Sequence, residues 1–304
     1  MNVPGYFLTK IEREFGDAGR AWLQQIPAIV ERCQQVWRLT DCTPIDDLTV
    51  NLVCFCTSEI HGDAVLKIQG PHSERYTEIE ALRLYDGRHC CRLMALDLDS
   101  AAMLLQRARP GLRLRDLPEC ERQLAIGAEM IGRLPIALPP HHALPSYSGW
   151  LDRAAAKLAR APDTMELRAL LETAREFFRD VGAESELPVL LHGDLHHDNI
   201  LQAGTDAWIA VDPQGVTGAR FLEAGRFIQN HALWGRGPMD EDKVVQTVQY
   251  VADHIDQPWT RLAKALFILH TLTVCWCWEA GEEQAELWRM GDQCVQIQSL
   301  IRQY

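Results

Sequence analysis

The stretch LLHGDLHHDNIL (190–201) places three histidines, two aspartates and an asparagine between two apolar ends. Two interpretations account for so many polar side chains. The spacing of His192 and His196 would put two imidazoles on one side of a helix, as in a zinc site. The flanking residues instead favour a strand–loop–strand structure, in which Asp194 lies on the loop. We favour the loop, with His196 and His197 as loop or substrate-side residues.

The composition is that of a globular protein and argues against several classes of partner. Of the 304 residues, 47% are hydrophobic and 24% are charged. The net charge of −12 disfavours nucleic acid and anionic membranes and mildly favours a cationic substrate. No signal peptide is evident, and no apolar run approaches the roughly 20 residues of a membrane span. The ten cysteines include no C-x-x-C pair, so we expect reduced thiols in a cytoplasmic protein.

The first third of the chain has the pattern of a small sheet with helices. Apolar residues in 11–37 recur at helical spacing, and Pro27 interrupts them. Residues 73–87 predict a second helix, which Ser73 can cap and Gly87 closes. The expected strands are 48–56, 63–69, 90–97 and 101–108.

Beyond residue 109 the pattern changes, and we place a lobe boundary there. Residues 1–108 would form an N-terminal nucleotide-binding lobe with a helical extension over 1–40. Residues 109–304 would form a helical C-terminal lobe that carries the loop and the substrate site. The expected helices are 116–134, 148–160, 163–181, 219–234, 239–255, 259–279 and 282–302, with strand-like pieces at 198–202 and 207–212.

The spacing inside the opening stretch matches a phosphoryl-transfer site, which needs few protein groups. Asp194 is followed five residues later by Asn199. In the D-x-x-x-x-N pattern the aspartate orients or deprotonates a hydroxyl and the asparagine carbonyl binds a metal ion. Asp212 ends an apolar strand thirteen residues further on and can meet Asn199 across a hairpin. These oxygen ligands suit Mg²⁺.

Lys67, at the end of the apolar strand AVLKI, is the candidate cation for nucleotide phosphates. The helix that follows offers two carboxylates, Glu78 and Glu80, and either can pair with the lysine. A lysine on a strand, a glutamate on the next helix, the D-x-x-x-x-N loop and a second aspartate follow one another in the order of a kinase.

The chain also resembles the aminoglycoside phosphotransferase family, whose signature is H-G-D-x-x-x-x-N with a downstream aspartate. Beyond that motif, the likeness lies in EALRLYDGR (80–88), MLLQRARPG (103–111) and VDPQGVTGARFLEAGRFIQN (211–230). It points to the branch of aminoglycoside 6-phosphotransferases (streptomycin kinases) and hydroxyurea-resistance kinases. The resemblance implies a protein-kinase-like fold, with ATP and Mg²⁺ as the phosphoryl-donor system.

The resemblance also implies a role for each matching residue. Asp194 would be the catalytic base, and Asn199 and Asp212 would be metal ligands. Lys67 would be the phosphate clamp, and Glu80 is preferred as its partner because it holds the glutamate place of EALRL.

Other residues would bind adenine or support the loop. The backbone of Gln106 to Ala108 would meet the adenine ring. His192 would fix the catalytic loop, and Glu223 would hydrogen-bond it from a place where relatives usually carry an aspartate.

The first hairpin departs from the family pattern, because residues 46–53 contain no glycine. Backbone N–H groups approach phosphates less closely without glycine. Either Thr49 and Asn51 supply side-chain donors, or nucleotide binding is weakened.

We therefore expect an α+β, bilobal, protein-kinase-like fold, with an antiparallel sheet and a helix in the small lobe and helices in the larger one. The expected function is ATP- and Mg²⁺-dependent phosphorylation of a hydroxyl on a small molecule, first of all the 6-hydroxyl of a streptomycin-like aminoglycoside. Glu279, Glu282 and Glu283 are candidates to face a cationic substrate. Two alternatives stay open: a kinase of another small hydroxylated metabolite, and a non-catalytic binding module that keeps the fold.

Overall fold

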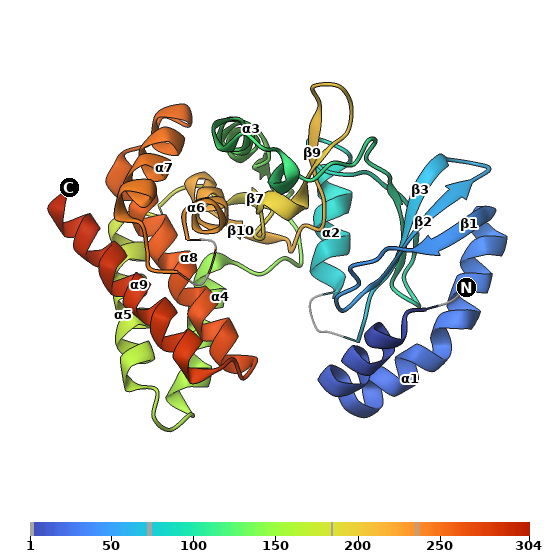
Figure 1. The fold of residues 1–304 in the computed structure, drawn as a ribbon, viewed down its shortest axis with the longest axis horizontal. Coiled ribbons are helices and arrows are strands. Elements are labelled where there is room, and N and C mark those ends of the chain that lie inside the picture. Colours follow the sequence, from blue (N-terminus) through green and yellow to red (C-terminus); the bar gives the residue numbers. More distant parts are fainter. Residues whose placement is uncertain (1–2, 72–74, 184, 234, 236) are drawn as a thin grey trace.

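The computed structural model describes residues 3–71, 75–183, 185–233, 235 and 237–304. The chain forms two lobes side by side, and the two termini lie at opposite ends of the long axis (Figure 1). A sheet with two helices makes up the smaller lobe, and helices dominate the larger one. The predicted α+β, two-lobed organisation is confirmed. Residue 108 as the boundary between lobes remains a prediction.

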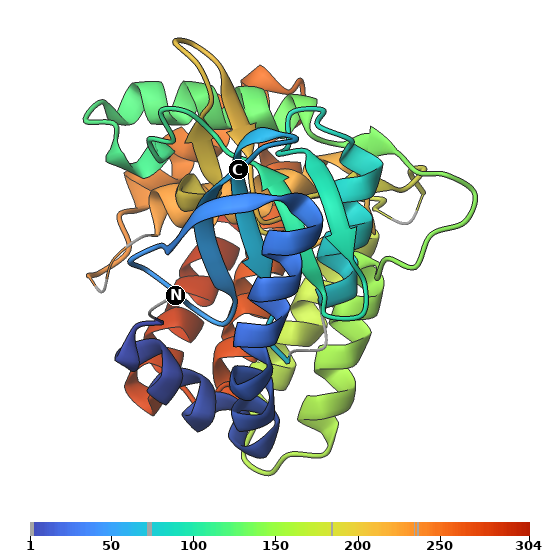
Figure 2. The ribbon, with the colours of Figure 1, turned by 90° about the vertical axis from the view of Figure 1, so that its right-hand side faces the viewer.

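The smaller lobe is built on an antiparallel sheet with strand order β1-β2-β3-β5-β4. Figure 2 shows α1 crossing the outer face of this sheet, while α2 lies between the sheet and the larger lobe (Figure 1). The elements are α1 (Gly5–Trp37), β1 (Leu39–Pro44), β2 (Leu52–Ser58), β3 (Gly62–Ile68), α2 (Arg75–Tyr85), β4 (Leu93–Asp97) and β5 (Ala102–Gln106).

Strand alternation separates two hydrophobic cores. In β5, Ala102 and Leu104 join the apolar residues of α1, whereas Met103 and Leu105 join α2 and the larger lobe. Helix α2 contributes Leu82 to the second core as well. One core therefore runs without interruption from the inner face of the sheet, through α2, into the helical lobe.

The larger lobe surrounds helix α8, which packs against α5, α6 and α9. Its short strands form two small sheets, β10-β7-β6 and the hairpin β8-β9, which frame the opening motif. The helical elements are η1 (Leu114–Asp116), α3 (Cys120–Arg133), α4 (Tyr147–Ala159), α5 (Met165–Asp180), η2 (His197–Asn199), η3 (Arg220–Glu223), α6 (Ala224–Ala232), α7 (Glu241–His254), α8 (Trp259–Glu279) and α9 (Gln284–Gln303). The strands are β6 (Ile136–Ala137), β7 (Val189–Leu191), β8 (Ile200–Gln202), β9 (Trp208–Ala210) and β10 (Val216–Gly218).

The helix predicted over 11–37 does not break at Pro27. It begins at Gly5, continues through Pro27, and changes direction at Gly16, where φ is 54° and ψ is −128°. Glycine adopts this backbone conformation without the steric cost that a Cβ brings.

Several strands differ from the predictions. The strand expected over 48–56 begins only at Leu52, because the residues before it form the turn from β1. Strands β1, β6 and β10 were not predicted; β6 and β10 have two or three residues, too few to show alternation. The expected cap Ser73 lies outside the described residues. Within the described ranges, no helix has the length and apolar character to cross a membrane.

Packing between α3 and α6 predicts a difference between two glycines of one helix. A Cβ on Gly127 would lie 1.9 Å from Cζ of Phe227, while a Cβ on Gly132 would meet nothing nearer than 3.7 Å. We expect Gly127→Ala to lower the free energy of unfolding by about 1–3 kcal/mol through overpacking. Gly132→Ala should be neutral or stabilising by up to about 1 kcal/mol, because alanine favours helix. Urea unfolding of both variants checks this, and equal effects would contradict it.

Candidate active site

Lys67 lies buried between carboxylates from both lobes. Its ammonium is 2.7 Å from Oε1 of Glu78 on α2 and 2.5 Å from Oδ1 of Asp212, which follows β9. Burial lowers the pKa of Lys67, but Asp212 and Glu78 outweigh it and hold that pKa above its ordinary value. The same burial raises the pKa of Asp212, and the charge of Lys67 brings it below the ordinary value. Burial likewise raises the pKa of Glu78, to about 7, against the lowering effect of the Lys67 charge.

The prediction that Glu80 pairs with Lys67 was wrong, because the structure places Glu78 beside Lys67. Two residues along a helix turn the side chain through about 200°, so only one of the two glutamates can face the lysine. Glu78 shares the buried side of α2 with Leu82 and Tyr85, at spacings i+4 and i+7. That apolar stripe was the signal in the sequence that selects Glu78.

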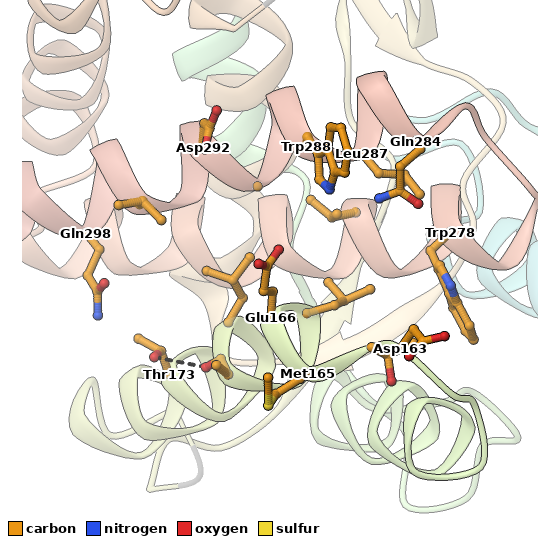
Figure 3. Close-up of a pocket in the computed structure, with 17 residues that line it drawn as sticks. Asp163, Met165, Glu166, Thr173, Trp278, Gln284, Leu287, Trp288, Asp292 and Gln298 are labelled. Carbon is orange, nitrogen blue, oxygen red and sulfur yellow. Dashed lines mark hydrogen bonds between the residues drawn. The ribbon is translucent and has the colours of Figure 1, made fainter.

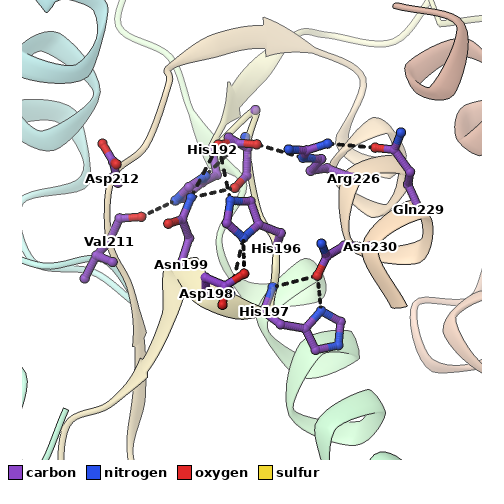
Figure 4. Close-up of polar contacts among 12 residues, drawn as sticks. His192, His196, His197, Asp198, Asn199, Val211, Asp212, Arg226, Gln229 and Asn230 are labelled. Atoms are coloured by element: carbon purple, nitrogen blue, oxygen red, sulfur yellow. Dashed lines mark hydrogen bonds and ion pairs between the residues drawn. The ribbon is translucent and has the colours of Figure 1, made fainter. Parts of the chain in front are cut away.

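The loop after β7 is held by backbone contacts of His192. Its Nε2 donates to the carbonyl of Val211 (2.9 Å), and its Nδ1 accepts from the backbone N–H of Asp194 (3.2 Å) (Figure 4). Burial lowers the pKa of His192 to about 4, so the imidazole is neutral. Both ring nitrogens are engaged, which leaves neither for zinc. The zinc interpretation finds no support among the described residues, where no group of three or more His, Cys, Asp or Glu could hold a metal ion.

Glu223, the last residue of η3 before α6, holds the same loop through hydrogen bonds. Its carboxylate accepts the backbone N–H groups of His192 (2.6 Å) and Gly193 (3.3 Å). The side chain is buried, and burial raises its pKa to about 7 against the opposing effect of these two hydrogen bonds. Gly193 has φ +80°, and a Cβ there would lie 2.8 Å from Val216, so the tight turn requires glycine.

Asp194 lies on this loop with one oxygen held firmly and the other loosely. Its Oδ1 accepts from Nε of Arg226 (2.7 Å), while its Oδ2 is 3.5 Å from Nε2 of His196 and from Nδ2 of Asn199. Burial raises the pKa of Asp194, but Arg226 and His196 bring it down to about 2. The carboxylate is therefore ionised, and its side chain is 35% exposed.

Asn199 directly precedes β8 and Asp212 follows β9, so the two residues lie at the same end of this hairpin. The backbone N–H of Val211, next to Asp212, donates to the carbonyl of Asn199 (2.9 Å). The Asn199 amide nitrogen donates to the backbone carbonyl of Asp194 (3.0 Å), so its amide oxygen is the atom that can take a cation. Asp212 has φ 60° and a side chain that is 55% exposed. An amide oxygen and an ionised carboxylate fit the ligand preference of Mg²⁺.

A second layer of contacts, not predicted from the sequence, supports the loop from behind. Arg115 forms a two-pronged ion pair with Asp198, with contacts of 2.7–2.9 Å. Asn230 accepts from Arg115 (2.8 Å) and contacts the ring of His197 (2.7 Å) (Figure 4). His197 also stacks on Phe227 with ring centroids 4.5 Å apart. His197 thus belongs to the support of the loop.

The glycine-free turn between β1 and β2 is tied to other segments. Tyr6 of α1 accepts the backbone N–H of Leu48 (3.0 Å) and donates to the carbonyl of Asp46. Asn51 is buried, and its Oδ1 accepts the backbone N–H of Gly70 (3.0 Å), whereas Thr49 is exposed. Nucleotide binding by Thr49 and Asn51 remains a prediction, as does adenine binding by the Gln106–Ala108 backbone at the end of β5.

A groove of about 1080 Å³ lies elsewhere, between α5 and α9 (Figure 3). Apolar side chains such as Leu170 and Trp288 line it together with Glu166 and Asp292. None of the predicted site residues lines this groove, so it is separate from the Lys67 cluster and the catalytic loop.

Sheet, lysine–glutamate pair and loop together define a protein-kinase-like phosphotransferase. A model of the aminoglycoside/hydroxyurea antibiotic resistance kinase family matches residues 37–281. The chain belongs to that family. It is 29% identical to streptomycin 6-kinase of Streptomyces glaucescens over 72% of this chain and 71% of the relative. It is also 29% identical to hydroxyurea phosphotransferase of Kitasatospora aureofaciens, over 72% and 65%. The chain is thus an enzyme that transfers a phosphoryl group to an alcohol group.

Solved structures show the same fold at low sequence identity. Choline kinase LicA from Streptococcus pneumoniae superposes with a TM-score of 0.66 at 9% identity, over 92% of this chain and all of that one. Aminoglycoside phosphotransferase APH(4)-Ia, in a complex with ADP and hygromycin B, gives 0.61 at 13% identity, over 90% and 98%. The protein-kinase-like fold predicted from the sequence is confirmed.

Removing each of the two α2 glutamates distinguishes the observed ion pair from the one predicted. Glu78→Ala leaves the buried ammonium of Lys67 with one partner, and we expect the free energy of unfolding to fall by about 3 kcal/mol. Glu80→Ala, two residues along the same helix, should change it by less than about 0.5 kcal/mol. Chemical denaturation measures both, and a larger effect at Glu80 would restore the original pairing.

Burial of Glu223 predicts a pH dependence of stability. Its pKa is about 7 in the folded protein against an ordinary 4.5, so the folded state binds more protons in between. Its contribution to stability is therefore complete below about pH 4.5 and is lost as the pH rises to about 7. The free energy of unfolding of the wild type, minus that of Glu223→Gln, should fall by up to about 1.4 kcal/mol per pH unit in this window. Parallel curves for the two proteins would exclude a raised pKa.

Proposed function

We propose that the enzyme uses ATP and Mg²⁺ to phosphorylate the 6-hydroxyl of a streptomycin-like aminoglycoside. The observation that carries this is the 2.5 Å contact between Lys67 and Asp212, which joins the lysine of the small lobe to the carboxylate beside the catalytic loop. Such an arrangement suits phosphoryl transfer, in which positioning and charge neutralisation supply most of the catalysis.

Lys67 would hold the nucleotide phosphates, with Glu78 keeping its ammonium in place. Asn199 and Asp212 would hold Mg²⁺, which when bound supplies positive charge against the phosphate oxygens. Gln106 to Ala108 would meet adenine through their backbone. The contacts of Lys67 with Glu78 and Asp212 support the first role, and the family resemblance supports the others.

Asp194 would orient the acceptor hydroxyl through its loosely held Oδ2. A bond then forms between the hydroxyl oxygen and the γ-phosphorus as the bond to the ADP oxygen breaks, and the hydroxyl proton leaves by way of the carboxylate. With a pKa of about 2, Asp194 orients the hydroxyl and passes its proton on to solvent rather than keeping it.

A cationic acceptor is supported by acidic residues at the turn from α8 to α9. Burial raises the pKa of the Cys277 thiol, Glu282 and Glu286 raise it further, and Arg226 lowers it. The two glutamates and Arg226 thus act on the same thiol, and Glu286 is itself paired with Arg289 at 2.6 Å. Glu279 is instead paired with Lys157 at 2.5 Å.

We also propose that the protein works in the cytoplasm, where ATP is available. The ten cysteines are all free, which suits a reducing compartment.

Removing the Asp194 carboxylate should abolish transfer. We expect Asp194→Ala to lower kcat by about 10²- to 10⁴-fold, because the acceptor hydroxyl loses its orienting group. Asp206→Ala, an exposed aspartate on the neighbouring hairpin, is the matched control and should keep wild-type activity. Coupled detection of ADP with streptomycin measures both, and retained turnover in Asp194→Ala would refute the mechanism.

The function is tested by mass spectrometry of a panel of aminoglycosides, hydroxyurea and hydroxylated metabolites incubated with Mg-ATP. A gain of about 80 Da on streptomycin, absent with Asp194→Ala, supports the proposal. A gain on another compound alone identifies the enzyme as a kinase of that compound. A panel without any gain, together with no ATP binding, favours the non-catalytic binding module.

A further inference from the structure

The catalytic carboxylate is held by an arginine that neither the D-x-x-x-x-N spacing nor the kinase-like order of the site predicts. Arg226 lies on α6, three residues after Glu223, and its Nε donates to Oδ1 of Asp194 at 2.7 Å. The two side chains are 27% and 35% exposed, so the ion pair is partly open to solvent. A half-covered ion pair of this kind contributes little to stability. Its effect is better sought in the position of Asp194.

The guanidinium is itself fixed from behind. Nη1 of Arg226 donates to Oε1 of Gln229 at 2.9 Å, one turn further along α6 (Figure 4). Nε2 of Gln229 lies 2.8 Å from Nδ1 of His270 on α8. Gln229 and His270 are both buried.

The series of hydrogen bonds from Arg226 through Gln229 to His270 allows one assignment of donors and acceptors. Burial lowers the pKa of His270 to about 4, so the ring is neutral and its Nδ1 can accept from the Gln229 amide. Because a guanidinium can only donate, the amide oxygen of Gln229 must face Arg226, and the amide nitrogen then faces His270. A planar guanidinium that contacts both Asp194 and Gln229 is fixed in one orientation, whereas the ammonium of a lysine would reach only one of these partners.

The two oxygens of Asp194 are divided by these contacts. Oδ1 is held by Arg226, whereas the contacts of Oδ2 with described residues are the 3.5 Å approaches to His196 and Asn199. Oδ2 is therefore the oxygen left to receive an acceptor hydroxyl.

We propose that Arg226, anchored through Gln229 to His270, is a positioning residue that fixes the Asp194 carboxylate with Oδ2 toward the acceptor hydroxyl. The inference rests on the proposed function, in which Asp194 orients that hydroxyl. It adds a chain of hydrogen bonds that runs from α8 through α6 to the catalytic loop.

Kinetics of the full-length enzyme with streptomycin and Mg-ATP test the proposal. Arg226→Met should lower kcat by about tenfold to a hundredfold, because a carboxylate displaced by about 1 Å orients its substrate poorly. The KM for both substrates should stay within about twofold of the wild type. Arg220→Met removes an exposed arginine from the preceding η3 and should change neither constant.

Two further variants separate position from charge. Arg226→Lys keeps the charge but cannot hold both Asp194 and Gln229, so most of the loss in kcat should remain. In Arg226→Ala, guanidinium at millimolar concentration should restore kcat several-fold, and ammonium should not. A raised KM with unchanged kcat would overturn the proposal in favour of substrate binding by Arg226. Full activity of Arg226→Met would overturn it outright.

A crystal structure of Arg226→Lys, compared with one of the wild type, gives a readout that needs no acceptor. We expect the Asp194 carboxylate to leave the position that the wild-type arginine imposes. An unmoved carboxylate refutes the positioning role even if streptomycin is phosphorylated. Conversely, a wild-type enzyme that phosphorylates nothing refutes the proposed function, whatever the carboxylate does.

Discussion

A buried lysine fixes the relation between the two lobes. An ammonium taken out of water without a partner costs several kcal/mol, so Lys67 needs its carboxylates in the folded protein. One of them, Glu78, comes from α2, and the other, Asp212, comes from the segment between β9 and β10. Thr77 adds a 2.6 Å hydrogen bond from α2 to the carbonyl of Gln214 in that segment. The charge of Lys67 thus holds the sheet, helix α2 and the catalytic hairpin against one another.

The catalytic loop obtains its shape from backbone contacts rather than from apolar packing alone. Glu223 accepts two successive N–H groups, and His192 joins the N–H of Asp194 to the carbonyl of Val211. Because both groups are buried, any other path of the loop would leave polar atoms without partners. A loop determined in this way presents Asp194 without further rearrangement, as charge-stabilising sites require. The glutamate at position 223, where the family resemblance implies an aspartate, reaches both donors.

Sequence reasoning succeeded where the chemistry is local. The D-x-x-x-x-N spacing and the strand before Lys67 depend on neighbouring residues, and the structure brings Lys67 into contact with Asp212 and Asn199 into contact with Asp194. Sequence reasoning failed where the outcome depends on which face of a helix a side chain occupies, or on pairing between residues far apart in the sequence. The apolar stripe of α2 selects Glu78 over Glu80. The family pattern EALRL pointed to Glu80 instead.

Other features had no signal in the sequence. The partners Arg115 and Asp198 are 83 residues apart, and an arginine on a predicted helix gives no sign of what it contacts. Strands of two or three residues such as β6 and β10 are defined by pairing, which no local pattern records.

The charges around Asp194 determine what kind of catalyst it can be. Arg226 and His196 stabilise its ionised form, and Asp198 in turn keeps His196 charged, since both carboxylates raise the pKa of that imidazole to about 9 against the effect of burial. A carboxylate with so low a proton affinity is a poor base but a good hydrogen-bond acceptor. In a loose phosphoryl-transfer transition state the nucleophile carries little positive charge, so early removal of its proton would gain little. Orientation of the hydroxyl is what such a reaction requires, and in the proposed mechanism Arg226, His196 and the backbone hydrogen bonds of the loop would hold Asp194 for that role.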